Sequence, residues 1–202
     1  MDDTRRSPIG RPRGFDADQA LERAMRVFWE QGYEGASLAD LTAAMGITKT
    51  SMYAAFGNKE ELFRKAVKRY EEGPAAYVAC ALAKPTAREV ATAFLTGSVT
   101  ASTLPDSPAG CLSVQGSLAA GETGRTAREL LTDWRNHGRA LLRDRFQRAL
   151  DDGDLPAGSD PALIARYVMT IANGIAVQAA GGTTRDELQE VATAALRHWP
   201  PA

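Results

Sequence analysis

Cysteine and histidine are scarce in this chain, which has two of each among its 202 residues. Cys80 and Cys111 stand in no CxxC or CxxH pattern, and HExxH does not occur, so the sequence predicts no bound metal and no cofactor. In a reducing compartment, a disulfide between two isolated cysteines is disfavoured. We therefore expect both residues to be free thiols.

Long apolar runs and enzyme motifs are also missing. No window approaches the roughly 18 consecutive apolar residues of a transmembrane helix, and the first six residues, MDDTRR, lack the apolar core of a secretory signal. The patterns GxGxxG, GxxxxGKS/T and GxSxG, which mark phosphate-binding loops and activated serines, do not occur. We expect a cytoplasmic protein that neither binds a membrane nor catalyses a reaction.

Neither sign of charge is in excess, with 24 Lys and Arg against 25 Asp and Glu. The net charge of −1 offers no bulk attraction to nucleic acid, so any such partner must be held by a local patch. The balance is nevertheless uneven along the chain. Residues 1–70 hold 12 basic against 10 acidic side chains, whereas residues 71–202 hold 12 against 15.

Alanine is abundant, with 36 residues against 14 valines and isoleucines combined, which favours helix over sheet. Apolar residues recur at helical spacing, and capping residues such as Ser37, Thr48, Asn58 and Thr86 precede several of these segments. The pattern predicts an all-α fold. One helix is predicted to begin after the Thr86 cap. The other predicted helices span residues 17–31, 38–45, 49–56, 59–70, 111–120, 125–150, 161–180 and 185–199.

Two short predicted helices, separated by Gly46 and flanked by longer ones, have the pattern of a helix-turn-helix. The second helix of such a unit enters the major groove of DNA, so its outward side chains are expected to be small, polar or basic. The outward residues of segment 49–56 meet this demand: they are Lys49, Thr50, Ser51, Tyr53 and Ala54.

Basic residues flank this predicted unit. Lys59 lies in the first turn of a helix, where the helix dipole disfavours a cation unless an anion is also present, and a DNA phosphate would supply one. Residues 1–14 contain Arg11 and Arg13 and have no apolar period. We interpret them as a flexible basic arm.

The stretch from Gly35 to Phe63, GASLADLTAAMGITKTSMYAAFGNKEELF, closely resembles the DNA-binding domain of the TetR (tetracycline repressor) family. The remainder of the chain matches the family in length and helical layout. The most specific residues are Tyr53, Phe56, Gly57, Lys59, Glu60, Leu62 and Phe63. By resemblance, the expected phosphate contacts are Ser37, Thr48, Tyr53 and Lys59. The expected base-facing residues are Lys49, Thr50, Ser51 and Ala54.

The resemblance implies three parts: the arm (1–14), where Arg11 and Arg13 follow the DNA backbone or enter the minor groove, a helix-turn-helix domain (15–60), and a helical effector-binding and dimerisation domain (61–202). Segment 161–180 is too apolar for burial on one side, which independently favours a partner surface. The candidate dimer residues are Ile171, Ile175, Gln178, Leu188, Val191, Ala192, Ala195 and Trp199. The candidates for an effector pocket are Cys111, Gln115, Trp134, His137, Gly138, Tyr167 and Asn173.

Several of these residues also have a plain structural interpretation. His137 lies on the apolar side of its helix, and a hydrogen-bonded core histidine is favoured over a pocket residue. A buried Cys111 is expected to pack as a small hydrophobic residue, with redox or soft-metal sensing as the alternative. The arginines interleaved with acids along segment 125–150 are interpreted as a solvated face: they are Arg125, Arg128, Arg135, Arg139, Arg143, Arg145 and Arg148.

The sequence thus predicts a homodimeric transcriptional regulator, most often a repressor in this family, that binds a palindromic double-stranded DNA operator. A small, partly hydrophobic effector is expected to release it. Two alternatives remain open from the residues alone. One is a regulator that senses oxidation or a metal at Cys111, and the other is a helical small-molecule-binding protein that lacks DNA binding.

Overall fold

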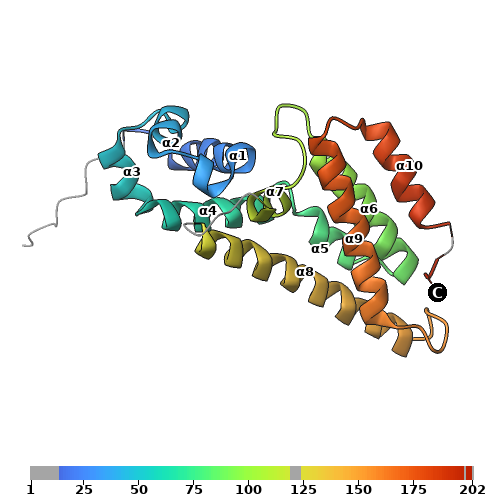
Figure 1. Ribbon diagram of the computed structural model, residues 1–202. Helices are drawn as coiled ribbons and strands as arrows, with labels where there is room; N and C mark the ends of the chain where they lie inside the picture. The colour runs from blue at the N-terminus through green and yellow to red at the C-terminus, as the bar shows by residue number, and fades with distance from the viewer. Residues whose placement is uncertain (1–13, 119–123, 198, 202) are drawn as a thin grey trace, which may run out of the picture.

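A computed structural model describes residues 14–118, 124–197 and 199–201 of the chain. The described residues form ten α-helices and no strand, which confirms the predicted all-α class (Figure 1). Arg11 and Arg13 of the expected arm lie outside the described residues. The helices are α1 (Ala17–Gly35), α2 (Leu38–Met45), α3 (Lys49–Phe56), α4 (Lys59–Glu72), α5 (Tyr77–Leu82), α6 (Ala87–Ser102), α7 (Leu112–Leu118), α8 (Arg125–Asp151), α9 (Pro161–Ala180) and α10 (Arg185–Ala195).

Helices α1 to α3 begin where their N-cap residues predicted. The side chains of Asp16, Ser37 and Thr48 each accept hydrogen bonds from backbone N–H groups in the first turn of the helix that follows. The predicted end of α1 at residue 31 is four residues short. Gly32 has a positive φ of 71°, as a helix-ending glycine does. The chain then resumes helical geometry, and α1 ends at Gly35.

The core of the N-terminal unit joins α4 to the first three helices. Phe63 of α4 is 1% exposed and packs edge-on against Phe28 and Tyr33 of α1, with ring centroids 5.0 and 5.1 Å away. Met52 of α3 is buried in the same cluster. The expected domain boundary at residue 60 therefore falls in the first turn of a helix whose later residues complete this core.

Helix α9 is central to the C-terminal helices, where it packs against α6, α8 and α10 (Figure 1). Among the described residues, α9 is the one helix long and apolar enough to cross a membrane. Its side chains at Ile164, Val168 and Ile175 are buried in a core shared with Phe146 of α8, as expected for a central helix of a bundle.

Two expectations about the C-terminal part are wrong. Helix α10 ends at Ala195 instead of residue 199, and Trp199 folds back so that its ring lies 5.8 Å from that of Phe146. The arginines of α8 do not all belong to a solvated face, because Arg145 is buried. Its guanidinium donates to the backbone carbonyls of Lys84 and Pro85, at 2.8 and 2.7 Å.

Two helical glycines differ in the space around them. A Cβ atom built on Gly97 of α6 would lie 2.3 Å from the ring of Tyr77, whereas one built on Gly138 of α8 would have no neighbour within 4 Å. Gly97 therefore allows α5 to approach α6 closely, with the Tyr77 ring against the backbone.

We expect Gly97→Ala and Gly138→Ala to have opposite effects on stability. The first forces the Tyr77 ring to move and should lower the free energy of unfolding by about 1–3 kcal/mol. The second gains helix propensity without a clash and should raise it by up to about 1 kcal/mol. Urea unfolding followed by circular dichroism measures both. Equal stabilisation by the two alanines would contradict the packing of Tyr77 on Gly97.

Candidate nucleic-acid interface and a neighbouring cavity

Helix α3 presents most of its predicted contact residues to solvent. Lys49, Thr50, Tyr53 and Ala54 are exposed, with Tyr53 at 43%, while Met52 on the opposite side is fully buried. The Thr48 cap fixes the start of α3, and the buried Met52 packs its inner face against the core. Its outer face has the small and polar side chains that allow a backbone to approach base edges.

Positive charge lies on both sides of this face. The Lys49 ammonium is 5.9 Å from the centroid of the Tyr53 ring, and that of Lys59 is 4.6 Å from the ring of Tyr33. Partial burial lowers the pKa of Lys59, and the nearby Glu34 carboxylate opposes this change. Lys59 is the first residue of α4, and its ammonium makes a cation–π contact with the ring of Tyr33.

Ser37 and Thr48, two of the expected phosphate contacts, are engaged in capping. The Ser37 hydroxyl donates to Asp40 Oδ2 at 2.5 Å, and the Ser37 backbone N–H donates to the same oxygen at 3.2 Å. These two bonds hold the pKa of Asp40 below its usual value. The hydroxyl of Thr48 pairs with that of Ser51 at 3.0 Å. A phosphate would have to compete with these bonds.

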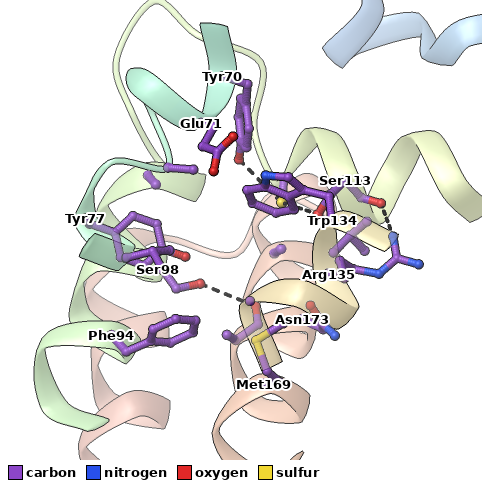
Figure 2. Close-up of a pocket in the computed structure, with 18 of the residues that line it drawn as sticks. Tyr70, Glu71, Tyr77, Phe94, Ser98, Ser113, Trp134, Arg135, Met169 and Asn173 are labelled. Atoms are coloured by element: carbon purple, nitrogen blue, oxygen red, sulfur yellow. Dashed lines mark hydrogen bonds between the residues drawn. The ribbon is translucent and has the colours of Figure 1, made fainter. Parts of the chain in front are cut away.

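A cavity of about 170 Å³ lies between the N-terminal unit and the C-terminal helices (Figure 2). Its wall is formed by residues of the helices from α4 to α9. The wall is largely apolar, and four aromatic side chains contribute to it: Tyr70, Tyr77, Phe94 and Trp134.

Five of the seven expected pocket residues line this cavity: Cys111, Trp134, His137, Gly138 and Asn173. The other two lie elsewhere. Gln115 donates from Nε2 to the carbonyl of Ala109 at 3.0 Å, and the Tyr167 hydroxyl donates to the carbonyl of Ala195 at 2.9 Å. Tyr167 thus fastens α9 to α10.

The favoured interpretation of His137 as a core histidine is wrong, because its side chain is exposed at the edge of the cavity. The sequence patterns also missed several lining residues, among them Tyr77, Phe94 and Ser98. Phe94 and Ser98 lie four residues apart on α6, so they share one face of that helix. That spacing marks an inward face but does not distinguish a packed core from a cavity.

Cys111 is half-buried in the cavity wall, and Cys80 is exposed; neither forms a disulfide. The Tyr70 hydroxyl donates to Cys111 Sγ at 3.3 Å, and the Ser113 hydroxyl lies 3.2 Å from the same sulfur. Burial, the larger cause, and the neighbouring thiol raise the pKa of Tyr70 well above its usual value. Within residues 14–118, 124–197 and 199–201, no cluster of three His, Cys, Asp or Glu side chains could hold a metal.

The expected dimer residues divide into three groups by exposure. Ile175, Leu188 and Ala192 are at most 2% exposed and belong to the core of the chain itself, so they are not available to a partner. Ile171, Ala195 and Trp199 are half-buried against the same core. Gln178 and Val191 are exposed. The outward apolar side chains of α9 are instead Leu163 and Val177.

This fold and surface define a class of protein: a helix-turn-helix unit with a solvent-facing second helix, joined to a helical body that contains a partly open cavity. The family described as bacterial regulatory proteins, tetR family, matches residues 20–66. The transcriptional repressor ComR of Escherichia coli K12 is 34% identical over 194 residues, which cover 95% of this chain and 92% of ComR. The chain therefore belongs to the TetR family and is a DNA-binding transcriptional regulator, not an enzyme.

Two further comparisons extend this assignment. A cysteine mutant of the TetR family transcriptional regulator CifR, solved in complex with 26-bp double-strand operator DNA, has 43% sequence identity and a TM-score of 0.89, and the match covers 94% of this chain and all of that one. The regulator YezE of Bacillus subtilis 168 is 49% identical over 70 residues, 35% of this chain and 36% of YezE.

Proposed function

We propose that the chain is a homodimeric repressor that a small molecule in the cavity releases from a palindromic operator. The observation that carries this proposal is the position of Tyr70, which lines the cavity and also packs in the core of the N-terminal unit. Its ring lies edge-on to that of Trp29 in α1, with the centroids 4.9 Å apart. A molecule that moves Tyr70 therefore acts on α1, the helix against which α2 packs.

In the DNA complex, we assign base contacts to Lys49, Thr50, Ser51 and Ala54 and phosphate contacts to Tyr53 and Lys59. The exposure of α3 and the charge at the start of α4 support this division. Ser37 and Thr48 act first as caps that orient α2 and α3, and they reach phosphate only by exchanging a capping bond. We also propose a cytoplasmic location, because a bacterial regulator must reach the DNA that it regulates.

The proposed dimer forms through α9 and α10. Leu163, Val177 and Val191 are apolar side chains that are 43%, 51% and 40% exposed, which supports a partner surface on these two helices. Pairing two chains by a two-fold axis would set the two α3 helices against half-sites about 34–36 Å apart, or a multiple of this spacing.

A second contact also joins the N-terminal unit to the rest of the chain. Arg26 of α1 donates to the carbonyl of Asp106 in the loop before α7, at 2.6 Å. An effector that favours a conformer with wrongly spaced α3 helices would weaken operator binding. A differential affinity of about 3 kcal/mol between the conformers corresponds to roughly 150-fold.

We expect Lys59→Ala to weaken binding to operator and to unrelated DNA by the same factor, because the lost contact is to phosphate. The slope of log affinity against log salt should fall by about one. Thr50→Ala should instead change the preferred sequence. Fluorescence anisotropy with DNA from upstream of the gene for this protein, at several salt concentrations, measures both effects.

The matched control is Lys68→Ala on the same helix, where the lysine side chain is 75% exposed and pairs with Glu72 within α4. It should bind as the unaltered protein does. Absence of a complex with any upstream fragment at low salt would contradict DNA binding by this chain.

For the dimer, we expect Val177→Asp to produce monomers, because it places a charge in the proposed apolar interface. Sedimentation velocity measures the change. Tyr53→Asp is the control, since Tyr53 is also exposed but lies on α3, and this variant should remain dimeric. A dimer that persists in Val177→Asp would place the interface elsewhere.

A further inference from the structure

The size of the cavity limits the ligand that it accepts. Its volume is about 170 Å³. For comparison, an apolar protein cavity of about 150 Å³ takes up benzene. Several lining residues are rigidly packed, with Phe94 and Ala172 at 3% and 6% exposure, so the wall yields little without strain. The space therefore fits about one six-membered ring with a short substituent.

The position of one aromatic wall residue is determined by the backbone beneath it. Tyr77 packs against Gly97, where even a Cβ atom would clash, and meets Phe94 edge-on with the centroids 5.6 Å apart. Trp134 lies across the cavity, as Figure 2 shows. Aromatic faces and edges on different sides of a small cavity favour a flat or compact apolar group between them.

None of the charged or titratable side chains Glu71, Arg135 and His137 that line the cavity is buried. The Arg135 guanidinium is directed away from the cavity, toward the backbone carbonyl of Ser113 (Figure 2), and partial burial lowers the pKa of Arg135. Glu71 and His137 are exposed. A charged ligand would lose its hydration on entry without a buried counter-charge, so the cavity favours a neutral one.

The polar groups deep in the cavity are neutral. The Ser98 hydroxyl donates to the carbonyl of Ala172 at 3.4 Å, which leaves its oxygen able to accept a hydrogen bond. Tyr77 lies beside Ser98, whose hydroxyl partly offsets the rise that burial causes in the pKa of Tyr77. Asn173 adds a carboxamide from α9 (Figure 2). These groups suit a ligand with one hydroxyl or carbonyl.

We infer that the cavity binds an uncharged compound of about one ring, apolar except for a single hydroxyl or carbonyl group that bonds to the Tyr77, Ser98 and Asn173 region. This inference rests on the proposed function, because it specifies the chemical class of the effector. It excludes carboxylates, amines and fused multi-ring compounds as tight ligands of this cavity.

Isothermal titration calorimetry of the full chain without DNA tests the inference. The probes are benzyl alcohol and cyclohexanol, with benzoate as the charged analogue and 1-naphthylmethanol as the larger one. We expect one molecule of either neutral single-ring alcohol to bind per chain. Benzoate and 1-naphthylmethanol should bind at least ten-fold more weakly than benzyl alcohol.

Three variants locate the binding. Gly138→Leu should weaken benzyl alcohol at least ten-fold, because its side chain grows from an unobstructed position in the cavity wall. Arg139→Leu places the same leucine side chain at the next, exposed position, where it replaces an arginine outside the cavity wall, and should leave the affinity for benzyl alcohol unchanged. Ser98→Ala removes a hydrogen-bonding group and should weaken the alcohols about five-fold, without the same effect on toluene.

Failure of both single-ring alcohols to bind, equal binding of benzoate, or full binding to Gly138→Leu would overturn the inference. A separate measurement of operator binding distinguishes failure of the inferred ligand class from failure of the proposed function. Alcohols that bind in the cavity and leave the operator complex intact would contradict effector release and uphold the ligand class. Release of the operator by benzoate and not by the alcohols would contradict the ligand class and uphold effector release.

Discussion

The Tyr70 side chain is common to the two functional parts of the molecule, and their arrangement depends on it. Its ring packs edge-on against Trp29 in the N-terminal core and lies 6.1 Å from the ring of Trp134 in the cavity wall. Its hydroxyl donates a hydrogen bond to the sulfur of Cys111, the residue just before α7. No further layer of side chains separates the DNA-binding unit from the cavity at this point. A ligand that moves Tyr70 would therefore also change the packing of α1, as the proposed function requires.

The inner and outer faces of α9 have different roles. The inner face of α9 completes the core with α6 and α8, so it cannot also bind a second chain. Its outer face has Leu163 and Val177, which a monomer would leave in water. The same helix also contributes Asn173 to the cavity. The proposed ligand site, the core and the proposed dimer thus use different sides of one helix.

Local signals made much of this fold predictable. Caps such as Thr48 lie next to the helices they start, so α2 and α3 could be bounded from sequence alone. Contacts between distant segments could not. Arg145 is buried because two carbonyls about 60 residues away accept its hydrogen bonds. Periodicity also marked an apolar side of α8 at His137 without showing that a cavity, not a core, lies there.

We propose that a ligand in the cavity and DNA on α3 oppose each other, and thermodynamic linkage allows one comparison to measure this opposition. Calorimetry gives the affinity of benzyl alcohol for the free protein and for the protein saturated with operator DNA. We expect benzyl alcohol to bind the free protein more tightly, by the same factor by which it weakens operator binding. Equal affinity for the two forms would contradict this opposition.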